Sequence, residues 1–368
     1  MEPDLIPILD PNPLPAPYWV FKLLLLVTFL LHILAMNFLL GGSVLALLSK
    51  FLPGDKTYRD RIFSDIARKL PVFLPATITL GIAPLLFVQV LYGQFFYTSS
   101  AILAWPWFLV LLFLTVAYYG FYYVSFQSAK QPGKGTSVML LSVLLVFSIG
   151  FIYSNNFTLS LTPARWKEKY FADPSGWNLN LLEPTVIPRF LHFFTGAIAV
   201  GGLVLVFLSL FRSKKDAEYG RSLFQFGGKA FLYATMAQFL LGLWFLASLP
   251  RDIRNLFLGD NPVATALLVI GATGGIGGIL LMSNALHNNN NRRAAYAIPA
   301  IIGVVIACMV MMRDILRDAY LKPYFHPSQF AIQTQWAVLP LFLVLFLAGV
   351  ALWLVMLKRY GLFASPKP

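Results

Sequence analysis

Residues 186–211 read VIPRFLHFFTGAIAVGGLVLVFLSLF, an almost unbroken apolar segment that contains one arginine, Arg189, and one histidine, His192. An α-helix rises about 1.5 Å per residue, so about 20 apolar residues cross the hydrocarbon core of a bilayer, which is about 30 Å thick. The segment is long enough to do so. It therefore predicts a transmembrane helix with a histidine near one end.

Eight further segments are similarly long and apolar. The chain of 368 residues is 58% apolar and only 12% charged, whereas soluble proteins have about 45–50% and about 25%. This composition excludes a soluble enzyme, a disordered tail protein and a nucleic-acid binder. We predict an all-α, polytopic membrane helix bundle in a single integral membrane domain, residues 1–368. The nine predicted spans are approximately 20–49, 72–95, 101–127, 136–160, 186–211, 226–249, 262–284, 295–313 and 334–357.

The net charge of +13 predicts how the bundle is oriented. Eighteen of the 28 Lys and Arg residues, but only five of the 15 acidic residues, fall in alternate loops and at the C-terminal end. Cytoplasmic loops retain positive charge, so we predict that the N-terminus is outside and the C-terminus inside, in a bacterial-type inner (cytoplasmic) membrane. The basic excess then indicates topology and contact with the lipid bilayer, not nucleic-acid binding.

Two histidines lie within predicted spans, His32 in the first and His192 in the fifth. Ionisable groups are costly inside a membrane, and neutral imidazole in an apolar setting is a ligand of haem iron. The alternative is a buried histidine hydrogen-bonded to a neighbouring helix. Glycines follow both histidines, at 41–42 and 201–202, and predict close approach of a second helix or of a flat macrocycle. His287, at the inner end of the seventh span, and His326, in the last outer loop, are more simply solvated or interfacial.

Arginines form a second group on the predicted outer side. Arg189 precedes His192 by three residues, and Arg251 and Arg254 lie between the sixth and seventh spans. Such side chains can hold haem propionates or a quinol headgroup by charge-assisted hydrogen bonds. The sequence Arg313-Asp314-Ile315-Leu316-Arg317-Asp318 closes the eighth span, and an exposed helical salt-bridge ladder explains it equally well.

These features together resemble subunit I of the cytochrome bd quinol oxidases. The resemblance consists of nine spans, His32 in the first, and Arg-Phe-Leu-His-Phe-Phe-Thr-Gly at 189–196 opening the fifth. Further matches are Gly-Arg followed by Lys-Ala-Phe within 220–231, and Gln-Val-Leu-Tyr-Gly-Gln-Phe-Phe at 89–96. The similarity extends thinly over nearly the whole chain.

The resemblance implies roles for individual residues. His32 would ligate a haem of the family's oxygen-reducing pair, and His192 the low-spin haem that receives electrons from quinol. The quinol site would lie in the segment 250–262, which contains Arg251 and Arg254. The methionine that pairs with the histidine of the fifth span would lie in the seventh span, where Met282 is the nearest candidate. Apart from the resemblance, other possible thioether ligands are Met36, Met236, Met309 and Met312. Methionine more often simply fills space in a protein core.

The sequence also departs from that family. Residues 101–127 and 300–312 contain no acid, although the family places a glutamate in each of these spans, and the segment 250–262 is much shorter than the family's quinol loop. We therefore predict a membrane electron-transfer subunit of a quinone-linked respiratory complex that binds one or two b-type haems and is not an oxygen reductase. Its redox partner would be an outer-face protein such as a c-type cytochrome. The alternatives are a haem-free membrane anchor of a redox complex and a small-molecule transporter.

Overall fold

The computed structural model describes residues 12–53, 55–288 and 291–360, and this part of the chain contains nine helices that are long and apolar enough to cross a membrane. The predicted all-α class and the number of spans are confirmed, and the chain is a multi-pass membrane protein. The nine long helices are α1 (Tyr18–Ser49), α3 (Leu70–Ile102), α4 (Ala104–Lys130), α5 (Thr136–Ser160), α7 (Val186–Arg212), α8 (Ala217–Ser248), α10 (Pro262–Asn288), α11 (Asn291–Leu321) and α12 (Val338–Tyr360). Shorter elements connect them: α2 (Lys56–Ala67), η2 (Pro163–Arg165), α6 (Trp166–Ala172), α9 (Arg251–Asn255), η3 (Leu256–Asp260) and η4 (Pro327–Gln329).

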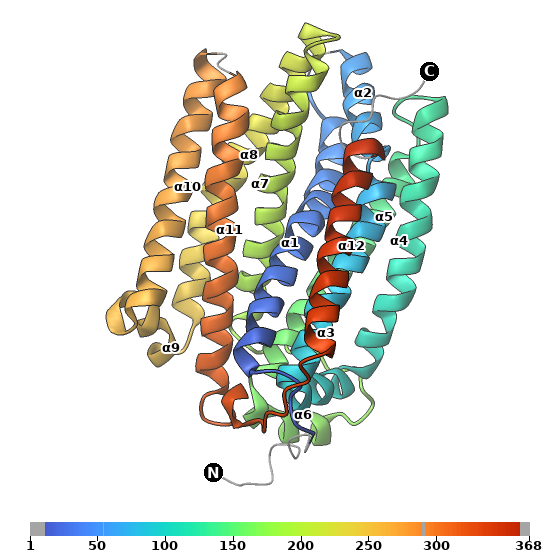
Figure 1. Cartoon of the computed structure of the whole chain (residues 1–368). Coiled ribbons are helices and arrows are strands. Elements are labelled where there is room, and N and C mark those ends of the chain that lie inside the picture. The colour runs from blue at the N-terminus through green and yellow to red at the C-terminus, as the bar shows by residue number, and fades with distance from the viewer. Residues whose placement is uncertain (1–11, 54, 289–290, 361–368) are drawn as a thin grey trace.

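The long helices stand side by side, and their connections alternate between two ends of the bundle (Figure 1). One end carries α2 and is called here the α2 end; the other carries α6 and α9 and is called the α6 end. The connections predicted to be inside lie at the α2 end, and those predicted to be outside lie at the α6 end. The fold therefore separates the two loop sets in the way that the charge pattern requires.

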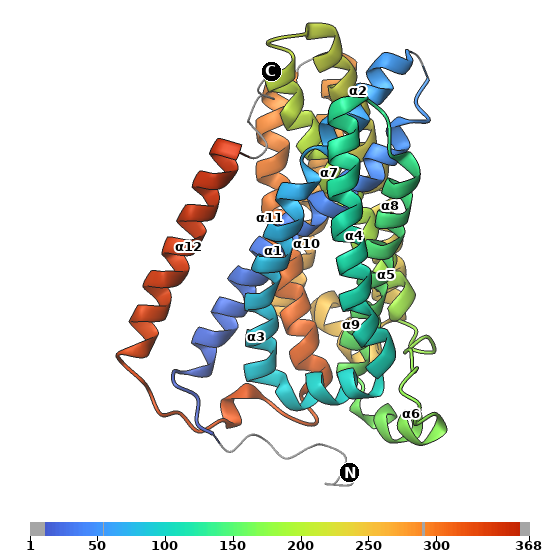
Figure 2. The same ribbon diagram turned by 90° about the vertical axis from the view of Figure 1, so that its right-hand side faces the viewer.

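Several helices extend beyond the predicted spans because a helix can continue past the end of its apolar run. The eighth predicted span, 295–313, is part of α11, which continues to Leu321. The predicted loop at 96–100 is helical, because α3 continues through it to Ile102. At Tyr92 the backbone of α3 is non-helical, with φ −138° and ψ 30°. The last part of α3 consequently turns across the α6 end of the bundle (Figure 2).

Glycines allow the central helices to approach closely. A Cβ atom on Gly201 of α7 would lie 2.8 Å from the carbonyl carbon of Gly41 of α1. Between α7 and α8, a Cβ on Gly202 or on Gly227 would lie 2.6 Å from the other residue's carbonyl oxygen. Helix association in lipid depends on this kind of close van der Waals packing between small residues. These glycines therefore serve helix packing, one of the two roles that the sequence left open.

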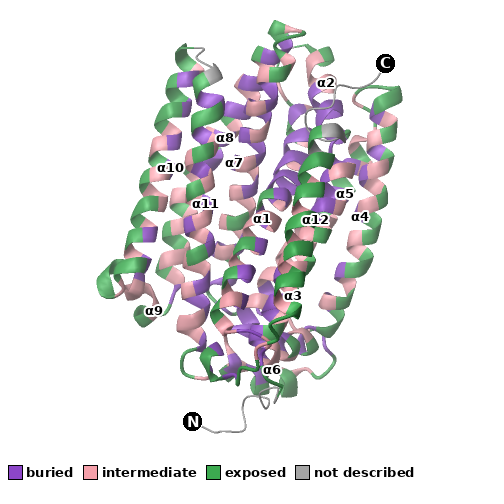
Figure 3. Cartoon of the chain, viewed as in Figure 1, coloured by how far each residue is buried: buried purple, intermediate pink, exposed green. Residues whose placement is uncertain are grey.

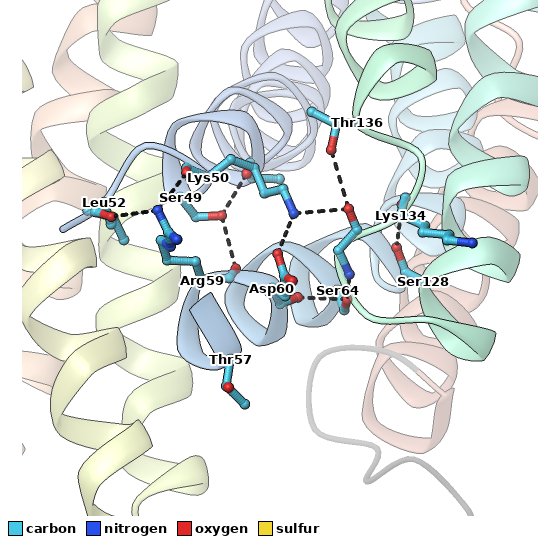
Figure 4. Close-up of polar contacts among 12 residues, drawn as sticks. Ser49, Lys50, Leu52, Thr57, Arg59, Asp60, Ser64, Ser128, Lys134 and Thr136 are labelled. Atoms are coloured by element: carbon cyan, nitrogen blue, oxygen red, sulfur yellow. Dashed lines mark hydrogen bonds and ion pairs between the residues drawn. The ribbon is translucent and has the colours of Figure 1, made fainter. Parts of the chain in front are cut away.

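Polar contacts attach α2 to the bundle (Figure 4). Lys50 at the end of α1 forms an ion pair with Asp60 of α2 and donates a hydrogen bond of 3.0 Å to the carbonyl oxygen of Gly133. The amide of Gly133 donates in turn to the Ser64 hydroxyl, also at 3.0 Å. The loop between α4 and α5 is thus held against α2.

The last helix, α12, stands apart from the others. Its described side chains are all exposed or half-buried (Figure 3), and the view in Figure 2 shows it separated from the other long helices. Near its beginning it contacts α3, where the rings of Phe342 and Phe87 are 6.1 Å apart. The α12 helix therefore contributes little to the core that positions the two intramembrane histidines.

Candidate functional site

His32 lies near the middle of α1 and faces α3. Its Nδ1 is 3.0 Å from the carbonyl oxygen of Thr77, and because a carbonyl can only accept, Nδ1 carries the hydrogen. In the neutral ring Nε2 then has a free lone pair, and this orientation is common among metal-ligating histidines. Space for the ring exists because residue 81 is glycine: a Cβ on Gly81 would lie 2.8 Å from Cε1 of His32.

His192 lies in the first third of α7 and faces α8. A Cβ on Gly242 of α8 would lie 3.3 Å from Cε1 of His192, so this ring too stands against a glycine. Its Nδ1 is buried and has no hydrogen-bond partner. The backbone oxygen of His192 accepts a hydrogen bond of 2.6 Å from Nε2 of Gln238. A buried polar atom without a partner costs about 1–3 kcal/mol, so the orphaned nitrogen marks the ring as a candidate for a ligand.

The two histidines lie at the same level of the bundle. Helices α1 and α7 run in the same direction (Figure 1) and are in register at Gly41 and Gly201. Each glycine follows its histidine by nine residues, so the histidines lie within about one helical turn of each other in height. This agrees with the predicted matching depth. The two rings nevertheless face different helices, α3 and α8, and do not point into one shared gap.

Three arginines line a cavity of about 30 Å³ towards the α6 end. They are Arg189 of α7 and Arg313 and Arg317 of α11, and Tyr92 and Phe157 complete much of the wall. We call this space the arginine cavity. Its volume admits a water molecule or part of a carboxylate group and does not admit a macrocycle.

Two of these arginines have no acidic partner. Arg189 has Nε and Nη2 buried without a hydrogen bond, and its guanidinium carbon lies 5.1 Å from the centre of the Phe245 ring. The guanidinium carbon of Arg313 lies 4.4 Å from the centre of the Phe29 ring and 5.0 Å from the centre of the Phe157 ring. Among the described residues neither arginine forms an ion pair. Buried cations without counter-charges are costly, so the arginine cavity is suited to an anionic group.

The end of α11 differs from the exposed ladder that the sequence allowed. Asp314 and Arg317 do form an ion pair three residues apart, but both residues are buried. Asp318 contacts Lys22 of α1 and Tyr92 of α3. The helix α11 continues eight residues past the predicted end of the span, so Asp314, Arg317 and Asp318 lie within the bundle. They contact other helices and one another, and they do not form an exposed salt-bridge ladder.

Arg251 and Arg254 are not brought to the histidines. Both lie on α9, where Arg251 is exposed and Arg254 donates a hydrogen bond of 3.4 Å to the carbonyl oxygen of Ala247. Neither lines the arginine cavity. The segment between α8 and α10 is helical, in α9 and η3, and Gly259 provides the positive φ of 138° that ends it.

Met282 is not near His192. Its Sδ would lie 3.0 Å from a Cβ on Gly228 of α8, whereas His192 faces Gly242 of the same helix. Fourteen residues (242 − 228) separate these two positions, which corresponds to about 21 Å along α8. The structure therefore does not pair Met282 with His192 on one iron. Met282 is fully buried among apolar side chains, so it fills space in the core, as methionine more often does.

The other two histidines lie at the ends of the bundle, as the sequence suggested. His287 is exposed near the end of α10. His326 lies in the connection before α12, where Nδ1 is 2.8 Å from the Ser328 hydroxyl and the ring meets Tyr18 edge-on at 5.6 Å. Both contacts are those of interfacial side chains.

Sequence reasoning missed several residues of this region, namely Lys22, Thr77, Gly81, Tyr92 and Gly242. Tyr92 lies within the matched stretch 89–96 but receives no role there, and nothing in the local sequence distinguishes the other four, because their importance comes from the helix they face. The sequence shows Arg313 and Arg317, but the predicted end of the eighth span at residue 313 places them at the surface. A signal was available: Arg and Asp three and four apart after an apolar run can equally continue a buried helix.

Comparison with known proteins supports the fold. No protein-family model matches the chain, and no curated protein sequence matches it. Among solved structures, one chain of the bd oxidase from Geobacillus thermodenitrificans matches with a TM-score of 0.67 and 13% sequence identity. The match covers 94% of this chain and 99% of that one. The chain therefore has a cytochrome bd-like fold.

Proposed function

We propose that this chain, which has the cytochrome bd-like fold, is a membrane electron-transfer subunit that binds b-type haem through His32 and His192. The observation that carries the proposal is the pair of imidazoles at one level on adjacent parallel helices, each against a glycine. Nε2 of His32 is left free by the contact of Nδ1 with Thr77, and Nδ1 of His192 has no partner. Since the two rings face different helices, we propose two haem sites and not one shared iron.

The donor set suits haem better than a bare metal ion. In the described ranges no group of three or more His, Cys, Asp or Glu side chains could hold a metal ion. A porphyrin supplies four ligands itself and needs only one or two axial ligands from the protein. Single imidazoles in apolar surroundings, such as His32 and His192, meet that requirement.

Arg189 and Arg313 are the proposed partners of the propionates. Both are cations without an acidic partner, both line the arginine cavity, and Arg189 lies one turn before His192. Guanidinium groups bind carboxylates with strong, oriented hydrogen bonds. The cavity of about 30 Å³ accommodates a propionate end alone. Accommodation of the porphyrin ring therefore requires the side chains between the helices to repack. Met282 is not among the proposed ligands, because it lies far along α8 from the level of His192.

When bound, haem would supply reversible one-electron chemistry; the protein would contribute ligation, burial and electrostatic field. His32 and His192 hold iron from separate helices, and the arginines compensate the negative charge of the propionates. The exposed Arg251 and the half-buried Arg254, outside the arginine cavity, are the proposed contacts for a quinone headgroup. The electron partner would be a protein at the outer face, such as a c-type cytochrome, in a quinone-linked complex of a bacterial-type cytoplasmic membrane.

Electron transfer is proposed in place of oxygen reduction. Reduction of oxygen requires a haem with an open coordination site and acids that deliver protons to it. The helix α4 contains no acidic residue, and α11 contains none before Asp314. The carboxylates of α11 lie at the α6 end, beside the arginine cavity, and pair with cations there.

A pyridine haemochrome spectrum of the purified chain tests the proposal. We expect b-type haem, about half of it lost in His32→Ala or in His192→Ala, and all of it lost in the double variant. The matched control is the double variant His287→Ala, His326→Ala, which removes two interfacial histidines and should leave haem content unchanged. A chain without haem, or a His32→Ala, His192→Ala variant with full haem content, would overturn the proposal.

A further inference from the structure

Three basic residues gather at the α2 end, where α2 meets the start of α3. They are Arg68 and Lys69, in the connection between these two helices, and Arg212, the last residue of α7. Asp65 of α2 forms ion pairs of 3.1 Å with both arginines, and the charges of all three of these residues act on Lys69. We call Arg68, Lys69 and Arg212 the basic cluster. With Asp65 included, three cations and one carboxylate leave a formal charge of +2.

The carboxylate of Asp65 has no capacity left for Lys69. Its Oδ1 accepts hydrogen bonds of 3.1 Å from Nη2 of Arg68 and from Nη2 of Arg212. Its Oδ2 lies 3.1 Å from Nε of Arg212 and accepts a hydrogen bond of 2.8 Å from the Tyr219 hydroxyl of α8. A carboxylate has about four lone-pair sites. These four contacts therefore use all of them.

The other acidic residues of the loops at this end are engaged elsewhere. Four remain in the sequence, and the structure gives each a partner of its own: Asp55 with the Thr57 amide, Asp60 with Lys50, Asp216 with Arg61, and Glu218 with the Tyr58 hydroxyl. A counter-charge for Lys69 must therefore come from outside the chain.

Lys69 is nevertheless a buried residue. It is only 8% exposed, and it forms no ion pair with any described residue. Lys50 shows the contrast, because it is paired with Asp60 (Figure 4). A buried ammonium group without a counter-charge is costly. Its nitrogen is not fully enclosed, unlike Nε of Arg189, so an anion from outside can reach it.

The position of Lys69 along the bundle indicates where that anion comes from. Lys69 immediately precedes α3, one of the membrane-spanning helices. The Tyr122 hydroxyl of α4 lies 3.5 Å from the carbonyl oxygen of Pro71, and its neighbours Tyr123 and Phe126 are 50% and 66% exposed. Tyrosines are enriched where a membrane meets water. Lys69 is therefore at the level of the phospholipid headgroups.

We propose that Lys69 and Arg68 bind the phosphate group of an anionic phospholipid at the α2 end. Lys69 supplies an ammonium group that no carboxylate of the chain neutralises. Arg68 uses only Nη2 for Asp65, and 36% of its side chain is exposed. Arg212 adds positive charge, but its fork is occupied by Asp65. Anionic lipids give the cytoplasmic leaflet its negative surface potential, and the charge pattern predicts that side for the α2 end. The inference goes beyond the proposed function and needs no haem.

Lipid binding to the full-length protein, purified in a neutral detergent, tests the proposal. Dioleoylphosphatidylglycerol, dioleoylphosphatidylcholine or sodium phosphate is added. Binding is followed by native mass spectrometry and by the midpoint of thermal unfolding, which a ligand of the folded state raises. We expect the anionic lipid to bind and to raise the midpoint of the wild type more than the other two. Loss of a charge-assisted hydrogen bond should lower its affinity in Lys69→Gln by about 10-fold or more.

Lys130→Gln is the matched control. Lys130 ends α4 at the same end of the bundle and is exposed, so this variant loses the same charge and keeps the basic cluster; it should bind the anionic lipid as the wild type does. Without lipid, Lys69→Gln should be at least as stable as the wild type, because it removes a buried charge that has no partner. If Lys69→Gln does not fold, Arg68→Gln decides by the same criterion, since Asp65 keeps its contacts with Arg212 and Tyr219.

Three results would overturn the proposal. Equal affinity for the anionic lipid in the wild type and Lys69→Gln means that the basic cluster does not bind it. An equal loss in Lys69→Gln and Lys130→Gln means that only the net charge of this end attracts the lipid. Equal effects of the anionic lipid and of sodium phosphate or the zwitterionic lipid mean that the site does not select an anionic phospholipid. None of these results depends on whether the protein binds haem.

Discussion

Gly201 of α7 rests directly on the backbone of Gly41 of α1, so closely that a Cβ on Gly201 would lie 2.8 Å from the carbonyl carbon of Gly41. Nine residues before each glycine stands one of the two intramembrane histidines. This single contact therefore sets the relative height of His32 and His192, and the geometry of the proposed site depends on it.

Gly201→Ala should destabilise the bundle by forcing α1 and α7 apart. Overpacking of a tight contact costs about 1–3 kcal/mol, and we expect a lower midpoint in thermal unfolding followed by helical circular dichroism in detergent. Gly277→Ala is the control, because a Cβ there meets nothing within 4 Å, and alanine has the higher helix propensity. Equal midpoints for the two variants would show that the contact between α1 and α7 is not tight.

Gly81→Ala should disturb the haem proposed at His32 and spare the one proposed at His192. The new Cβ would lie 2.8 Å from Cε1 of His32, a separation that real side chains do not tolerate, so the imidazole must move. We expect the haemochrome content to fall by about half while the remaining spectrum matches that of His32→Ala. Full haem content would mean that His32 does not ligate in the orientation described here.

Met282→Leu should leave the haem spectrum unchanged. About 21 Å along α8 separates the level of Met282 from that of His192, and a Met-to-Leu exchange in a core usually costs less than about 1.5 kcal/mol. The measurement is the absorption spectrum of the reduced protein. A shifted or weakened low-spin band in this variant would restore Met282 as a ligand.

Arg313→Gln should weaken haem retention. Loss of a charge-assisted hydrogen bond worth about 1.5–3 kcal/mol lowers affinity by about 10- to 150-fold, which can be followed as the rate of haem transfer to an excess of apomyoglobin. Arg251→Gln, which changes an exposed arginine outside the arginine cavity, should behave like the wild type. If both variants lose haem at the wild-type rate, the cavity does not hold propionates.

Asp216 should make stability depend on pH at the α2 end. It caps α8 by accepting a 3.0 Å hydrogen bond from the amide of Tyr219, and it forms an ion pair with Arg61. Both contacts hold the pKa of the Asp216 carboxyl below its ordinary value, and the capping hydrogen bond has the larger effect. The resulting stabilisation is present above the unfolded-state pKa, about 3.9, and is lost as pH falls through the lower folded-state pKa.

Asp216→Asn should therefore unfold at a lower temperature than the wild type at pH 7, and the difference should shrink on acidification below about pH 4. Asparagine can still cap the helix, so the variant isolates the charge. Thermal midpoints measured between pH 3 and pH 7 provide the check. A difference that does not change with pH would contradict a role for the ionised carboxylate.

The level of the histidines shows how far prediction from sequence can go. His32 and His192 could be placed in spans because hydropathy is a property of contiguous residues, and their depth could be estimated by counting along each helix. The faces that the rings turn to, α3 for His32 and α8 for His192, could not be predicted, because helix rotation depends on which neighbours pack closely.

The amino-acid sequence by itself determined the membrane class, the nine spans, the alternation of loops between two ends and the two intramembrane histidines. Each of these follows from local composition, since an apolar run of sufficient length is stable only across a bilayer. Tertiary structure alone decided that Lys22 meets Asp318, 296 residues away, that Tyr92 joins them, and that Met282 lies far from His192. The reason is that such contacts depend on the register between helices, which close packing at glycines such as Gly41 and Gly201 sets after the spans have formed.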